Sequence, residues 1–112
     1  MKKLYFYTVD FNNAEGAKHT LTCTEVEVRE TEKLYLCADK NMGFPNGLCR
    51  LPKNTVDTGS VYDGYLILTK PDEESARAVW RRHYGENADT FARRAEQWRK
   101  YAEECREIAA TL

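Results

Sequence analysis

The chain has 112 residues and a mass of 13.0 kDa, which is the size of one domain. Hydrophobic residues make up 42% and charged residues 31%, a balance typical of globular rather than disordered proteins. The formal net charge is −1, so no overall field directs the chain toward nucleic acid or membrane. No apolar run approaches the ~20 residues that cross a bilayer. These features predict a cytoplasmic protein with a single domain, residues 1–112.

Strand signals occupy residues 1–70. Residues 3–11 are rich in aromatic and β-branched side chains, and residues 19–30 alternate strongly between apolar and polar. Residues 33–38 follow after a tight connection, so the three runs predict an antiparallel meander. Residues 61–70 are the last expected strand. The sequence therefore predicts an α+β fold with an antiparallel sheet of four or five strands.

Two of these strands are apolar on both faces. In residues 3–11, Tyr5, Tyr7 and Val9 point to one face, and Leu4 and Phe6 point to the other. Residues 61–70 show the same property, so both strands are predicted to be central in the sheet. One face should take the helices. The other face must be covered by residues 39–61, by a partner or by a ligand.

Residues 71–112 are predicted to form two helices packed on one face of the sheet. Pro71 and the three carboxylates that follow it are typical of a helix start. Gly85 is a natural stop for the first helix, and Asn87 or Asp89 would cap a second helix that runs close to Leu112.

A strict seven-residue repeat marks the second predicted helix. One row consists of Phe91, Trp98, Cys105 and Leu112, the adjoining row of Ala95, Ala102 and Ala109, and Tyr101 and Ile108 widen the stripe. Such a repeat favours a supercoiled contact with another helix. The stripe would pack either on the first helix and the sheet of the same chain or on a second copy. Because the first helix is too short to cover the stripe, we expect a homo-oligomer, most simply an antiparallel dimer with helix 87–112 in the interface and Trp98 as its anchor.

Arginines interleave with aromatic residues in the same half of the chain. This set forms an alternative ligand site, with guanidinium groups on phosphate and rings that stack on bases: Arg81, Arg82, Arg93 and Arg94, with Trp80, Tyr84, Tyr5 and Tyr7. Glutamates three or four residues from several arginines favour the simpler interpretation, a solvated charged helix face.

The four cysteines have no metal-binding spacing, so neither a metal site nor a cofactor is expected. We expect reduced, buried thiols, with Cys23 and Cys37 able to face each other across a hairpin. Cys49 lies in a segment rich in Gly and Pro and is the one candidate nucleophile. It would need His19 or His83 as a base within hydrogen-bond reach.

Three functions follow from these patterns. The preferred one is a non-enzymatic binding protein that acts through protein–protein contacts, for example an inhibitor of a host or bacterial defence factor of the kind that bacteriophages and mobile elements encode. The second is a binder of nucleotide or nucleic acid, including a sponge for a signalling nucleotide. The third is a small thiol enzyme that uses Cys49.

Overall fold

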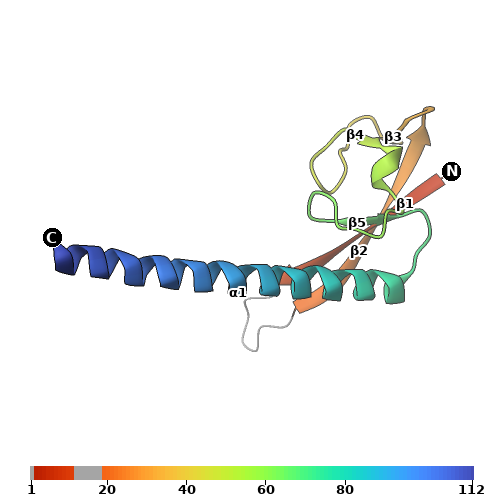
Figure 1. Cartoon of the computed structure of the whole chain (residues 1–112). Coiled ribbons are helices and arrows are strands. Elements are labelled where there is room, and N and C mark those ends of the chain that lie inside the picture. The colour runs from red at the N-terminus through yellow and green to blue at the C-terminus, as the bar shows by residue number, and fades with distance from the viewer. Residues whose placement is uncertain (1, 12–18) are drawn as a thin grey trace. The chain divides into compact units, whose positions relative to one another are not determined.

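The computed structural model describes residues 2–11 and 19–112 (Figure 1). In chain order the elements are β1 (Lys2–Phe11), β2 (His19–Glu30), β3 (Leu34–Cys37), β4 (Arg50–Pro52), a 3₁₀ turn (Lys53–Thr55), β5 (Leu66–Leu68) and α1 (Glu73–Thr111). The chain forms two compact units, residues 1–81 and 82–112, so that α1 contributes its first turns to one unit and the remainder to the other.

The five strands form one antiparallel sheet in the order β4-β3-β2-β1-β5. β1 and β2 pair over their whole length, from Lys2 opposite Val28 to Phe11 opposite His19. The α+β class, the antiparallel sheet and the meander of the first strands are thereby confirmed. The prediction that residues 61–70 form a central strand is wrong, because β5 pairs with β1 alone and is the last strand in the order.

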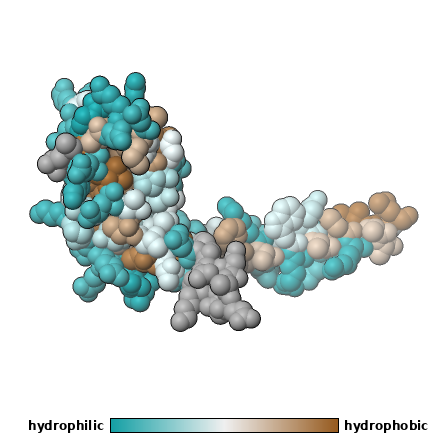
Figure 2. All heavy atoms as spheres, turned by 180° about the vertical axis from the view of Figure 1, so that it is seen from behind, coloured by the Kyte–Doolittle hydropathy of each residue, from teal (hydrophilic) through white to brown (hydrophobic). Residues whose placement is uncertain are grey.

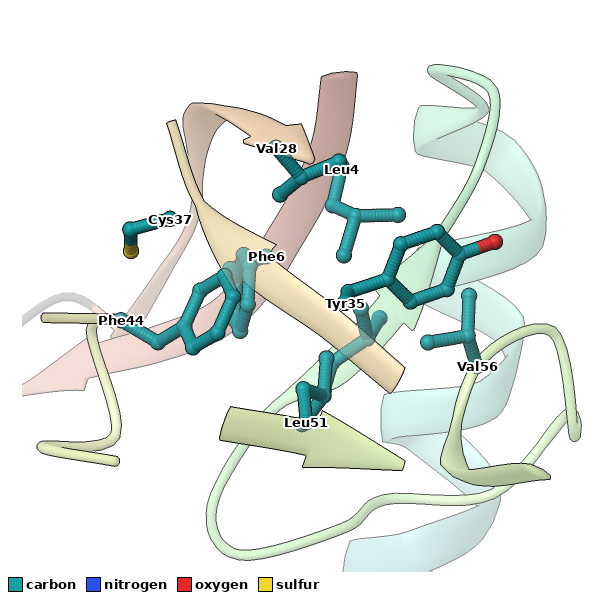
Figure 3. Packing of buried hydrophobic residues seen from close by; sticks show 9 residues of the cluster. Leu4, Phe6, Val28, Tyr35, Cys37, Phe44, Leu51 and Val56 are labelled. Carbon is teal, nitrogen blue, oxygen red and sulfur yellow. The ribbon is translucent and has the colours of Figure 1, made fainter. Parts of the chain in front are cut away.

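One face of the sheet is covered by the loops on either side of β4. Leu4 and Phe6 of β1 pack with Phe44 and Val56 of these loops and with Leu51 of β4 (Figure 3). The ring of Phe6 stacks on that of Phe44, with their centroids 5.6 Å apart. A tight turn presents Phe44 to the sheet: the N–H of Gly47, at φ +83°, donates to the Phe44 carbonyl oxygen at 2.8 Å. Of the three possible covers for this face, residues 39–61, a partner or a ligand, the structure shows the first.

The first turns of α1 cover the opposite face. Ala76 and Trp80 are buried against Tyr7 and Leu66. The indole N–H of Trp80 donates to the Tyr7 carbonyl oxygen at 3.1 Å, and the Tyr7 hydroxyl accepts from the backbone N–H of Asp72 at 3.0 Å. Unit 1–81 is therefore a sheet enclosed between two apolar layers.

The prediction of two helices is wrong, because α1 runs from Glu73 to Thr111 without a break. Gly85 lies inside α1, and its φ angle is not positive. It therefore does not adopt the left-handed conformation that ends a helix. A glycine in a helix costs only about 1 kcal/mol relative to alanine. Strong helix formers on both sides outweigh that cost, and no proline interrupts the run.

Candidate interaction surface

The unit of residues 82–112 consists of helix alone, so no second element within this unit buries its apolar side chains. The Phe91 side chain is 63% exposed and that of Trp98 is 69% exposed. Tyr84, Tyr101, Ile108 and Leu112 are exposed as well. Figure 2 shows the less polar residues along one side of this helix and the hydrophilic residues along the other.

The continuous helix extends the seven-residue repeat beyond the residues that the sequence pattern marked. The row of alanines contains Ala88, Ala95, Ala102 and Ala109, and the row of larger residues contains Tyr84, Phe91, Trp98, Cys105 and Leu112. We call these two rows the docking stripe. Sequence reasoning missed Ala88 and Tyr84 as members, because it placed a helix end at Gly85. The signal was present in their seven-residue spacing from Ala95 and Phe91.

A charged flank borders the row of alanines. The Arg99 guanidinium donates to the carboxylates of Glu96 and Glu103, one turn away on either side. The hydrogen bond from Arg99 lowers the pKa of the Glu96 carboxyl, and the reverse interaction raises the pKa of Arg99. These groups are solvent-exposed, so they define the charge pattern of the flank and add little to stability.

The sequence pattern allows the stripe to pack on a preceding helix and on the sheet of the same chain. That arrangement requires a turn between the two helical segments, and α1 has none. Two parts of one continuous helix cannot pack on each other. The exposed stripe is the largest apolar feature among the described residues of this unit.

The structure divides the arginine–aromatic set between the two units. Tyr5, Tyr7, Trp80 and Arg81 belong to unit 1–81, where the Tyr7 and Trp80 rings are buried in the core. Arg82, Tyr84, Arg93 and Arg94 belong to unit 82–112. Tyr84 makes an edge contact with the His83 ring at 5.5 Å, and the Arg94 guanidinium lies 5.8 Å from the centre of the Phe91 ring. The buried rings offer no free face on which a base could stack.

All four cysteines are free thiols, and only Cys37 is buried. Cys23 and Cys37, which the sequence allowed to face each other across a hairpin, do not do so, because the register places Cys23 opposite Tyr7 and Cys37 opposite Val28. The expectation of burial is wrong for Cys23 and Cys105, and Cys49 is exposed as well. Desolvation raises the pKa of the Cys37 thiol, which keeps it protonated.

Cys49 borders a shallow hollow of about 240 Å³ between β3 and the start of β4. Its lining includes Arg29, Asp39, Lys40 and Cys37, and none of the eight lining residues, all in the described part of the chain, is a histidine. The hollow therefore supplies no imidazole base for the thiol.

A larger hollow of about 480 Å³ lies beside the middle of β2. Three carboxylates line it, those of Glu25, Glu27 and Asp39, and its lining contains no lysine or arginine. Such a rim repels phosphate. Within residues 2–11 and 19–112, no cluster of three metal-ligating side chains occurs, and no helix is both long enough and apolar enough to cross a membrane.

Comparison with known proteins gives no relative: no family model, no curated protein and no solved structure matches the chain.

Proposed function

We propose that this protein acts by binding other protein surfaces rather than by catalysis, and that the docking stripe is the surface it uses. The observation that carries the proposal is the exposure of Phe91 and Trp98 on a unit that has no second element. Soluble proteins seldom expose a continuous apolar patch that has no partner. Aromatic side chains of this kind dominate the energetics of protein interfaces.

The shape of the stripe indicates a helical partner. The alanine row lets another backbone approach closely, and the seven-residue spacing keeps the contact in line along two helices that wind around each other. Residues 82–111 span about 45 Å at 1.5 Å per residue, which is long enough for about four heptads of contact. An inhibitor that occupies a helical surface of its target would need these properties.

Nucleotide or nucleic-acid binding is a weaker proposal. The buried rings of Tyr7 and Trp80 remove two of the four expected stacking platforms, and the hollow beside β2 has an acidic rim. Salt separates the two proposals, because contacts with phosphate weaken steeply as salt rises and apolar burial does not.

The test uses two matched substitutions in the full chain. Ala102→Glu places a charge in the docking stripe, and Ala110→Glu places the same charge on an exposed position outside it. Tagged wild-type protein and both variants are expressed in the cell of origin, and the proteins recovered with each, including untagged copies of the chain, are quantified by mass spectrometry.

Proteins recovered with the wild type and Ala110→Glu, and reduced at least tenfold with Ala102→Glu, would support the proposal. Equal recovery with all three proteins would overturn it. Circular dichroism of the purified variants establishes that neither substitution unfolds the helix.

A further inference from the structure

We propose that the docking stripe binds a second copy of this chain, with the two helices antiparallel and related by a two-fold axis that lies level with Lys100, between Trp98 and Ala102. The inference rests on the proposed function, since it names the occupant of the same surface. It goes further by fixing orientation and register.

The register comes from the positions of the two rows about Lys100. Reversing the helix about this residue exchanges the alanine row with the row of larger residues, position for position. Ala88 and Leu112 both lie twelve residues from Lys100, Phe91 and Ala109 nine, Ala95 and Cys105 five, and Trp98 and Ala102 two. Eight of the nine stripe positions thus pair with the same eight of a second copy, and each alanine faces a larger side chain. The register one heptad shorter, which pairs Tyr84 with Ala109, would leave Leu112 unpaired, and Leu112 is the most exposed side chain of its row.

Side-chain size favours this arrangement over a parallel one. In a parallel pair each residue meets its own equivalent, so Trp98 would meet the second Trp98 while Ala102 met the second Ala102. Crowded layers would alternate with empty ones, and both overpacking and cavities destabilise a contact. In the antiparallel register every layer combines one small and one large side chain.

Charge favours the same choice. In the antiparallel register Arg106 of one copy lies beside Ala92 of the other copy. Asp89 and Glu96 lie one helical turn before and after Ala92, so the guanidinium of Arg106 approaches two carboxylates. The two Arg99 side chains approach each other across the axis, which makes one contact between like charges. A parallel pair would instead bring Arg94 of each copy to Arg99 of the other, which makes two such contacts.

The register predicts a specific cross-link. Cys105 should face Ala95 of the second copy, so Ala95→Cys creates two symmetric thiol pairs for each dimer. Within one helix these positions are ten residues, or about 15 Å, apart, too far for a disulfide. With oxidised glutathione as oxidant, each new disulfide releases two protons and two electrons, which reduce one glutathione disulfide to two thiols. Most of the purified full-length variant at 50 µM should become a covalent dimer of twice 13.0 kDa on a non-reducing gel.

The linked peptides identify the register. Trypsin cuts after Arg94, Arg99, Lys100 and Arg106, so the expected product joins residues 95–99 of one chain to residues 101–106 of the other. The matched control is Ala109→Cys, because Ala109 is an exposed alanine of the same row as Ala95. Its thiol should face Phe91 and form at least tenfold less covalent dimer.

The outcomes separate the inference from the proposed function. Peptide 95–99 joined to itself, 101–106 joined to itself, or efficient linking of the Ala109→Cys variant would overturn the antiparallel register while leaving a stripe that binds protein. A wild-type protein of 13.0 kDa by light scattering at 50 µM, with no linking of Ala95→Cys, would overturn self-association itself. Loss of the proposed function requires the separate result that Ala102→Glu leaves every recovered partner unchanged.

Discussion

The two compact units of the chain differ in where their large apolar side chains lie. In residues 1–81, Leu4, Phe6 and Leu51 are completely buried, whereas Phe91 and Trp98 in residues 82–112 are more than half exposed. The cause is the number of elements in each unit. A sheet covered on both faces encloses its side chains, and a lone helix has nothing with which to enclose its own. Apolar side chains therefore maintain the fold in the first unit and are accessible to a partner in the second.

The sharpest test of this difference is one substitution made in both units. Phe6→Ala removes a fully buried ring that stacks on Phe44 and meets Tyr65 edge-on, so it should lower the free energy of unfolding by about 3–5 kcal/mol. Phe91→Ala should change it by less than about 0.5 kcal/mol in dilute protein, because that ring is exposed. Urea unfolding is followed by Trp80 fluorescence in a Trp98→Phe background. Equal losses from the two substitutions would contradict the comparison.

The two tryptophans provide a second matched pair. Trp80→Phe leaves the buried Tyr7 carbonyl oxygen without the indole donor, which should cost about 1–3 kcal/mol. Trp98→Phe should leave the thermal midpoint of the dilute protein nearly unchanged, since Trp98 is exposed. Circular dichroism during heating measures both midpoints. A greater loss of stability from Trp98→Phe than from Trp80→Phe would contradict the burial of Trp80 and the exposure of Trp98.

Much of unit 1–81 could be predicted from local pattern. The bounds of β2, residues 19–30, were predicted without error, and those of β1 to within one residue, because alternation and β-branched content act over the length of a single strand. The strand order around β5 could not be read in this way. Leu66 and Ile67 are buried on opposite faces of the sheet. Apolar residues on both sides of a strand show that both faces of the sheet are covered there, but they do not show whether the strand has a hydrogen-bonded neighbour on each edge.

The candidate surface was predicted in part for a related reason. Its seven-residue repeat is a property of the sequence, and it gave Phe91, Trp98 and Ala102 as stripe positions. The helix break at Gly85 was wrong because a glycine signals a helix end only where the chain adopts positive φ, and that is decided by the residues around it. The burial of Tyr7 and Trp80 depends on how the sheet and α1 pack together, which no local pattern contains.

Gly85 itself gives the third prediction. Because its backbone is helical and a Cβ built there meets nothing within 4 Å, Gly85→Ala should stabilise the helix by about 0.5–1 kcal/mol. Gly64→Ala is the control, because Gly64 has φ +83° and an added Cβ there is strained. Helical ellipticity followed during heating should persist to higher temperature in the first variant and to lower temperature in the second. A destabilised Gly85→Ala variant would indicate a turn at residue 85 and restore the two-helix prediction.

The smallest expected effect is a dependence on pH at the start of α1, in the well-packed unit. The Asp72 carboxylate accepts from the Ser75 backbone N–H at 3.0 Å and from its hydroxyl at 2.7 Å, and these bonds lower the pKa of Asp72 below its ordinary value. A carboxyl whose pKa is lower in the folded state stabilises the fold above its ordinary pKa, and that contribution is lost as the pH falls through the lowered value.

Asp72→Asn separates this titration from the cap itself, since the amide oxygen can still accept from Ser75 but carries no charge. At neutral pH the thermal midpoint of the variant should lie slightly below that of the wild type, because the negative charge at the helix start is lost. The difference between the two midpoints should shrink as the pH is lowered from 6 to 2.5. Asp72→Ala should have a lower midpoint than either at neutral pH, because it removes the acceptor. If the midpoints of the wild type and Asp72→Asn stayed a constant distance apart over this range, the Asp72 cap would not be the titrating group.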